Sequence, residues 1–324
     1  MERCVPDTSY LASPHFFAST LHCLAIIEVP ILTYGGYCIL YKTPSHMKCV
    51  KWLMLNLHFW TALLDVFLSF ISIPYLVLPA MAGYSLGIFR CTWLQPYMLV
   101  TLLGALAASI LAINEDRYFH LSGPKTHWSR VRKLVLCLIY LYVPLVFIPP
   151  FFNIPDQESA RLYVHKVLPC LPVYDYDDQL LFVLALDYRI PLICVAVSTT
   201  VLSTFLGAFN VAIIRNLRRK KSNQQRTISV RMSKMQRSFV VALTIQAVFQ
   251  ITVILIPIIV SLLTIVAWYH NQVLNNFIFI ALSLHGIGST VVMILVHKSY
   301  RDFTFSKILI VRKVNSVLEY LKKY

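Results

Sequence analysis

The feature that most constrains this chain is the absence of charge from long stretches. From Leu94 to Ile113 there is no charged residue, and Glu115, Asp116 and Arg117 then follow in a row. A helix needs about 20 apolar residues to cross the hydrocarbon core of a bilayer, whereas a soluble helix scatters charge over its exposed face. The stretch therefore predicts a membrane-spanning helix that ends in water near Tyr118.

The same pattern recurs along the chain. Hydrophobic residues make up 58% of the sequence and charged residues only 13%, about half the share typical of soluble domains. The apolar residues come in blocks, which predicts an all-α membrane protein, a bundle of seven transmembrane helices. We expect a terminal segment at 1–15, spans at about 16–40, 52–80, 94–118, 134–152, 188–214, 239–267 and 275–296, and a tail at 297–324.

The positive charge lies mainly on one side of these spans. The loops 41–51, 119–133 and 215–238 and the tail hold 23 of the 29 lysines and arginines. Basic loops face the cytoplasm in membrane proteins, so we expect the amino terminus outside and the tail inside. Orientation in the lipid bilayer accounts for nearly all of the net charge of +15, and we expect no nucleic-acid partner.

Several chemistries are not supported by any motif. The eight cysteines include no C-x-x-C pair, and the sequence has neither an H-E-x-x-H motif nor a glycine-rich phosphate loop. We therefore expect no metal, no cofactor and no enzymatic activity.

Two acids are expected inside the bilayer, Glu28 and Asp65. Burying such a charge costs about 2.5–3.5 kcal/mol even on the gentler insertion scale, so each is expected to be protonated, paired or solvated by an internal cavity. Asp65 serves either as a switch or ion site, or as a structural group whose hydrogen bonds are satisfied. Glu28 has the same two interpretations. The possible partners are Ser109, Ser283, His285, Ser289 and Thr290.

The sixth expected span contains two amides and a proline. Gln246 and Gln250 are four residues apart and share one helical face, and Pro257 predicts a kink. The amides either hold a hinge or reach a ligand, or they make ordinary interhelical hydrogen bonds worth about 0.6 kcal/mol each.

The predicted topology places Cys91 and Cys170 on the same, oxidising side of the membrane. A disulfide between them would tie the long acidic loop across the bundle. Two free thiols are the alternative, and Cys4 is a possible competitor.

Two basic segments are expected at the inner membrane face. Arg218 to Lys221 form a positive anchor beside anionic lipid, which is compatible with a second role toward an acidic or amphipathic cytoplasmic partner. In the tail, Val314, Val317, Leu318 and Leu321 repeat at helical spacing, which predicts a short amphipathic helix lying on the membrane.

Taken together, these features resemble the G-protein-coupled receptors, and finer matches resemble the class H nematode serpentine chemoreceptors (Srh), within the Str superfamily. The resemblance covers about residues 30 to 303. It is carried by Tyr37-Cys38-Ile39-Leu40-Tyr41-Lys42-Thr43-Pro44, Asn56-Leu57-His58-Phe59-Trp60, Ile73-Pro74-Tyr75, Ala82-Gly83-Tyr84-Ser85-Leu86-Gly87, Pro169-Cys170-Leu171-Pro172, Ser283-Leu284-His285-Gly286 and His297-Lys298-Ser299-Tyr300-Arg301.

Two departures from the family pattern matter. Class H receptors are expected to have Glu-Asn-Arg-Tyr at the inner end of the third span, whereas this chain has Glu115-Asp116-Arg117-Tyr118, which is closer to the rhodopsin-like pattern. The seventh span lacks the rhodopsin-like Asn-Pro-x-x-Tyr, so the activation contacts of that motif do not carry over.

The resemblance implies a chemosensory receptor in the plasma membrane, in the sensory cilia of chemosensory neurons, that binds a small odorant or soluble chemical and activates a heterotrimeric G protein. In the resting state Arg117 is expected to pair with Asp116 or Glu115, and Tyr118 completes this coupling switch. Asp65, Glu28, Gln250 and Pro257 are expected to form a buried polar switch. The expected ligand-pocket residues, chosen for lying in the outer halves of spans, are Tyr75, Tyr97, Thr101, Thr264, Trp268 and Phe279.

Two other functions remain open. Glu28 and Asp65 would serve a ligand-gated ion channel or transporter as midplane ion groups, and a non-signalling membrane scaffold would show no ligand response.

Overall fold

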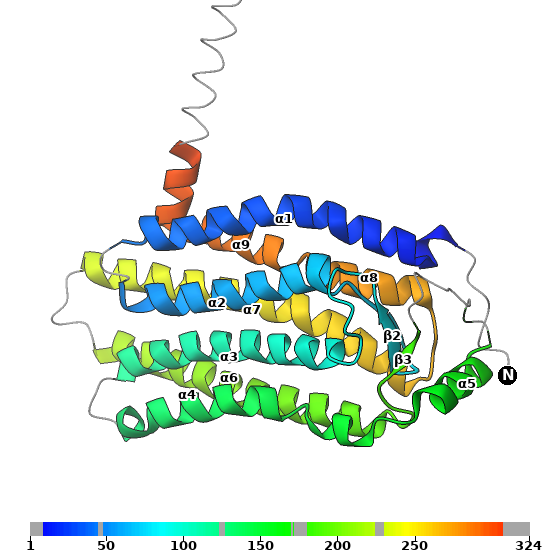
Figure 1. The fold of residues 1–324 in the computed structure, drawn as a ribbon. Helices are drawn as coiled ribbons and strands as arrows, with labels where there is room; N and C mark the ends of the chain where they lie inside the picture. Colours follow the sequence, from blue (N-terminus) through cyan, green and yellow to red (C-terminus); the bar gives the residue numbers. More distant parts are fainter. Residues whose placement is uncertain are drawn as a thin grey trace, which may run out of the picture.

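The computed structural model describes residues 9–44, 48–122, 127–169, 171, 180–223 and 230–306. Within them, seven helical segments are long and apolar enough to cross a membrane, and they run side by side as one bundle (Figure 1). The predicted seven-helix membrane bundle is confirmed. Its helices are α1 (Pro14–Lys42), α2 (Lys48–Val66), α3 (Gln95–Ser122), α4 (Trp128–Leu145), α6 (Arg189–Asn223), α7 (Val230–Val266) and the consecutive pair α8 (Gln272–Ser283) and α9 (His285–Val296).

The two ends of the bundle differ in kind. One end, here called the basic end, is where α1 leads to α2, α3 leads to α4 and α6 leads to α7. The opposite end, here called the hairpin end, holds a small β-sheet and the short helix α5 (Gln157–Val167), and helix α1 begins there (Figure 1). The described parts of the acidic segment, 153–169, 171 and 180–187, belong to the hairpin end.

The outer surface of the bundle is apolar, as a bilayer requires. Ile26 on α1 is 75% exposed, and Ile256 and Leu263 on α7 are 57% and 61% exposed. In water such a surface would be costly and prone to aggregation, whereas in a bilayer it meets lipid. Polar and charged side chains are instead buried between helices, where the candidate site lies.

The prediction that the second span continues as helix to Ala80 is wrong. Helix α2 passes into a π-helical turn at Phe67–Ile71, after which the chain forms strand β1 (Pro74–Val77) and strand β2 (Ala82–Ser85). The strands pair antiparallel, with Pro74 opposite Ser85. Pro74 has no N–H for a helical hydrogen bond and disfavours helix at the residue before it, so the segment leaves the helix.

A third strand completes the sheet. Strand β3 (Phe182–Val183) pairs antiparallel with β2, and the side chain of Gln157 both donates to and accepts from the backbone of Val183, each at 3.0 Å. The three strands are here called the β-lid. Helix α5 begins at Asp156, whose carboxylate accepts the Ser159 N–H and hydroxyl, and these bonds hold the pKa of Asp156 below its ordinary value. Neither β3 nor α5 was predicted.

The open edge of the β-lid is satisfied by polar side chains around the start of α8. Gln272 donates to the Leu76 carbonyl at 3.2 Å, Asn275 donates to the Leu78 carbonyl at 3.3 Å, and the His270 ring hydrogen-bonds the same carbonyl at 2.7 Å. Irregular backbone is tolerated at membrane depth only where protein or a water-filled cavity surrounds it. These side chains supply the partners that lipid lacks.

The seventh span is two helices rather than one. Helix α8 ends at Ser283 and α9 begins at His285, with Leu284 between them. This break turns the backbone at His285 and Gly286 toward α2. The expected tail helix at 314–321, Cys4 and Cys170 lie outside the described residues, as do the side chains of Arg218 to Lys221.

Candidate functional site

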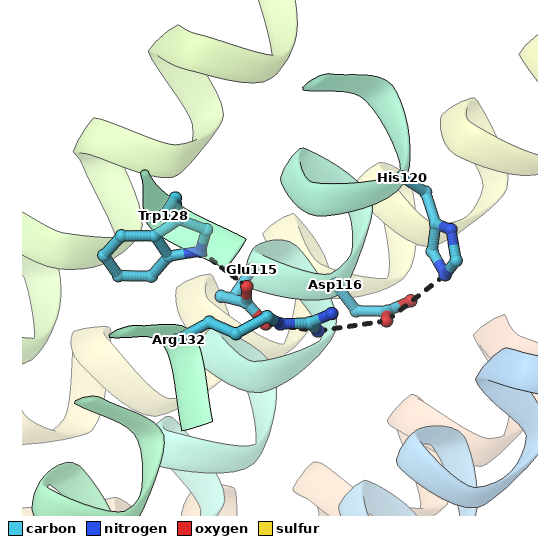
Figure 2. Close-up of polar contacts among 5 residues, drawn as sticks. All are labelled: Glu115, Asp116, His120, Trp128 and Arg132. Carbon is cyan, nitrogen blue, oxygen red and sulfur yellow. Dashed lines mark hydrogen bonds and ion pairs between the residues drawn. The ribbon is translucent and has the colours of Figure 1, made fainter. Parts of the chain in front are cut away.

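A buried ion pair joins α3 to α4 at the basic end. Glu115 is completely buried, and its carboxylate accepts from the Trp128 indole N–H at 2.7 Å and from Arg132 at 2.8 Å (Figure 2). Trp128 and Arg132 are four residues apart, so they reach α3 from the same face of α4. Glu115 is therefore held by two donors from the next helix.

Asp116 extends this cluster toward water. Its Oδ1 lies 3.4 Å from Arg132 Nη2 and 3.5 Å from the His120 ring, whose side chain is 49% exposed. Arg132 also stacks over the Phe119 ring, with the guanidinium carbon 3.9 Å from the ring centre. Arg132 thus bridges both acids of the motif, and its flat group is fixed by an aromatic ring.

Arg117 lies in the same region, between Asp116 and the end of α9. It is only partly exposed and lies near enough to Asp116 and to His297, after the end of α9, for electrostatic interaction. Arg132 pairs with Glu115, and the expected pairing of Arg117 with Asp116 or Glu115 stays a prediction. Arg132 therefore links α3 to α4, whereas Arg117 lies near the end of α9.

Tyr118 belongs to an aromatic cluster beside the ion pair. Its ring centre lies 5.7 Å from that of Phe209 on α6 and 6.5 Å from that of Trp128, and Phe209 lies 5.4 Å from Trp128. Edge-to-face rings at such distances add stability beyond their buried area. The cluster joins α3, α4 and α6 and holds Trp128 in place for its bond to Glu115.

The two intramembrane acids meet in the middle of the bundle. Glu28, Asp65 and His285 are each completely buried, and His285 Nδ1 lies 3.7 Å from Asp65 Oδ1. Glu28 and Asp65 lie against each other from α1 and α2. Of the five partners considered for Asp65, the structure brings His285 to it. Three helices therefore share one cluster of ionisable groups, and a bilayer interior limits how many of them carry charge at once.

Gly286 makes room for this cluster. A Cβ atom at Gly286 would lie 1.4 Å from Asp65 Oδ2, so a side chain there overlaps the carboxyl group. The break between α8 and α9 thus presents bare backbone to Asp65. The Ser283-Leu284-His285-Gly286 segment and Asp65, far apart in sequence, form one structural unit.

Helix α7 is tied to α9 by the two amides. Gln250 donates to the Ser289 hydroxyl at 2.7 Å, and His297 lies 3.3 Å from the Gln246 oxygen. These contacts run along α7 toward the basic end, on the same side as Arg117. Movement of α7 away from α9 would break both.

A cavity of about 160 Å³ lies beneath the β-lid and is here called the lid cavity. It is partly open and is lined by α3, α6, α7 and α8, together with Leu76 of β1 and Leu78 and Met81 of the turn after β1. Phe279 and Pro257 line it as well. Among the described residues that line it, the one hydroxyl is that of Ser261, which already donates to the Pro257 carbonyl at 2.9 Å, so the wall is apolar.

Of the six expected pocket residues, only Phe279 lines this cavity. The Tyr75 hydroxyl donates to Ala12 and the Tyr97 hydroxyl to Pro144, both at backbone carbonyls, and Thr264 donates to the Ser261 carbonyl. Trp268 adopts φ +50° at the end of α7 and packs near Tyr188. Thr101 is partly buried on α3. Ligand contact at all six residues stays a prediction.

The expected disulfide stays a prediction. The thiol of Cys91 is free and exposed, and Cys170 lies outside the described residues.

Sequence reasoning missed the residues that complete the site. Arg132 and Trp128 were assigned to a basic loop, although their four-residue spacing matches that of Glu115 and Phe119. Gly286 was quoted only as part of a motif, and the residues of β1 were assigned to a helix end. Matched i, i+4 pairs on the two flanks of a short loop were the available signal.

Comparison with known proteins supports one family. The family model for the serpentine type 7TM GPCR chemoreceptor Srh matches residues 12–310. The curated protein "Serpentine receptor class H-72" of Caenorhabditis elegans is 27% identical over 324 residues, covering 98% of this chain and 92% of that protein. With seven membrane-spanning helices around the sites described above, this chain belongs to the Srh family of serpentine chemoreceptors and is a multi-pass membrane protein with the role of a chemosensory receptor.

Proposed function

We propose that this receptor binds a small odorant in the hairpin-end half of the bundle and activates a heterotrimeric G protein at the basic end. The observation that carries the proposal is the buried Glu115–Arg132 pair beside Arg117. A buried ion pair does not generally add stability over apolar packing. Its position at the basic end of the bundle therefore favours a conformational role, in which the pair holds the resting state and breaks on activation.

The orientation follows from charge. The basic end carries the lysine- and arginine-rich loops, and the hairpin end carries the acidic segment. By the positive-inside rule the basic end faces the cytoplasm. In a chemosensory neuron the β-lid then faces the outside of a sensory cilium, and the Glu115 lock faces the G protein.

The proposed mechanism is a shift between two bundle arrangements. Ligand in the lid cavity touches α7 at Pro257 and Ile258, where the proline leaves one helical hydrogen bond unmade. Movement of α7 about this point loosens Gln250 from Ser289 and Gln246 from His297. Arg117, next to His297, then turns into a cleft that receives the G protein.

The buried acids take part as a switch in this account. Asp65, Glu28 and His285 connect α1, α2 and the α8–α9 break, so a change in the bundle alters their packing. All three are completely buried, which favours a switch over the ion path of a channel or transporter.

The test is nucleotide exchange on purified heterotrimeric G proteins, driven by the receptor in lipid nanodiscs with an odorant panel. We expect an agonist to accelerate exchange with the wild-type receptor and not with Arg117→Ala, which should reach the cell surface normally. Wild-type exchange from Arg117→Ala would remove the proposed role of Arg117. Agonist-evoked current in cells depleted of G proteins would favour the channel instead.

A further inference from the structure

A second cavity, of about 140 Å³, lies between α3, α6 and α7 and is here called the α6 cavity. It adjoins the lid cavity, since Val100, Leu103, Val195 and Ile258 line both. An engineered protein cavity of about 150 Å³ holds one benzene molecule. The two cavities together therefore suit a ligand of about six to twelve non-hydrogen atoms.

One wall of the α6 cavity carries hydroxyl groups. Ser198, Thr199 and Ser203 line it from α6, while the remaining lining residues are apolar. Elsewhere in the bundle, several serines and threonines donate to the carbonyl four residues earlier, as Thr204 does to Thr200 at 2.7 Å. Among the described residues, the hydroxyls of Ser198, Thr199 and Ser203 have no hydrogen-bond partner.

These three hydroxyls also run from the interior to the surface of the bundle. Ser198 is buried, Thr199 is partly exposed and Ser203 is exposed. Helix α6 packs along α3, and α7 packs on α8 and α9, whereas α6 and α7 hardly touch in the part of the chain that the structure describes. A molecule dissolved in the bilayer can therefore approach the hydroxyls between α6 and α7.

The linings also exclude some ligands. Of the described residues that line the two cavities, none is charged, so a carboxylate or an ammonium group would lose its hydration without gaining a partner. A pure hydrocarbon would leave the α6 hydroxyls unpaired. A mainly apolar molecule with one neutral oxygen meets both conditions. Its oxygen accepts a hydrogen bond from an α6 hydroxyl, and its hydrocarbon part fills the remaining volume.

We propose that the α6 cavity is the polar half of the odorant site, and that it takes neutral, mainly apolar molecules anchored by one ketone, aldehyde, ester or alcohol oxygen on Ser198, Thr199 or Ser203. The proposal rests on the proposed function, since it names the ligand class of that receptor. The lid cavity then holds the apolar end of the same molecule.

The direct test is photolabelling of the receptor in phosphatidylcholine nanodiscs with an aliphatic diazirine ketone of about ten non-hydrogen atoms. We expect labelled residues within 195–206 or 251–258. We expect 2-octanone to compete for labelling, and octane and octanoate to compete at least several-fold less well. Labelling confined to residues that line neither cavity, or equal competition by octanoate, would overturn the proposal. So would labelling that no ketone displaces, because a lipid acyl chain would then be the occupant.

Two variants distinguish the contribution of the α6 hydroxyls to ligand preference from that of the cavity's apolar lining. The triple variant Ser198→Ala, Thr199→Val, Ser203→Ala should lose the preference for 2-octanone over octane by about three- to tenfold, the value of one hydrogen bond. Thr200→Val on the exposed side of α6 should leave it unchanged. An unchanged preference in the triple variant overturns the proposal. Thermal unfolding in nanodiscs checks that each variant is folded.

The outcomes distinguish this inference from the proposed function. Activation of a G protein by odorants that do not label α6 or α7 would leave the receptor function standing and overturn the ligand site. Ketone binding in the α6 cavity without nucleotide exchange on any G protein would support the site and contradict G-protein coupling.

Discussion

Arg132 Nη2 on α4 lies 2.8 Å from Glu115 Oε2 on α3 (Figure 2). The ion pair crosses the short connection between two helices, and its acid is completely buried. In this account it holds α4 against the inner end of α3 until the receptor is activated.

We expect Arg132→Gln to raise basal signalling by about fivefold or more, since allosteric coupling energies are typically about 1–3 kcal/mol. The variant should also lower the free energy of unfolding by about 3–5 kcal/mol, because Glu115 is left buried without its cation. Nucleotide exchange without ligand and thermal unfolding measure the two effects.

Arg130→Gln is the matched control for that change, since Arg130 is exposed two residues away and should alter neither quantity. The double variant Glu115→Gln, Arg132→Gln should recover stability while keeping high basal activity. Basal signalling at the wild-type level in Arg132→Gln would show that the pair is not a lock.

Asp116→Asn should raise basal activity less than Arg132→Gln. The Asp116 contacts, at 3.4 Å and 3.5 Å, are longer than the Glu115 contact, and His120 is half exposed. Partly exposed pairs contribute about 1 kcal/mol or less, which corresponds to an increase below about fivefold. An increase equal to that of Arg132→Gln would shift the main lock from Glu115 to Asp116.

The bond between Gln250 and Ser289 is expected to restrain α7 in the resting state. Gln250→Ala and Ser289→Ala should each raise agonist potency, and a double-mutant cycle should give a coupling of about 0.6 kcal/mol, and at most about 1.7. Thr252→Ala, exposed on α7 and bonded to its own backbone, should change nothing. Additive effects of the two variants would argue against a shared role.

Gly286→Ala should prevent stable folding, because the new Cβ atom would lie 1.4 Å from Asp65 Oδ2. Adding Asp65→Ala should restore part of the surface expression by removing the overlapping group. Gly207→Ala, where a Cβ meets nothing within 4 Å, should leave expression unchanged or improve it, as alanine favours helix by up to about 1 kcal/mol. Normal expression of Gly286→Ala alone would refute the tight Asp65 contact.

The membrane spans could be predicted from sequence because charge exclusion is a local property of each span. The β-lid could not, because buried strands and buried helix ends are both uninterrupted apolar runs. Pro74 and Pro79 indicated that the helix is interrupted there, but not that strands replace it. The edge partners Gln272 and Asn275 lie almost 200 residues further along the chain, where no local pattern refers to the strand.

The site was predictable only in part, for the same reason. The acids Glu28 and Asp65 were recognisable because each is costly in a bilayer. Their meeting with His285 depends on how three helices are rotated, and rotation is set by packing rather than by composition. Arg132 likewise became a partner of Glu115 only when α4 began at Trp128, several residues earlier than expected.

The most direct test of the account is ligand-stimulated nucleotide exchange on a purified G protein, measured for wild-type receptor, Arg132→Gln and Arg117→Ala in the same nanodiscs. We expect ligand to stimulate exchange in the wild type, exchange to be high without ligand in Arg132→Gln, and ligand to give no stimulation in Arg117→Ala. Equal exchange from all three receptors, with a ligand that stabilises each against thermal unfolding, would contradict it.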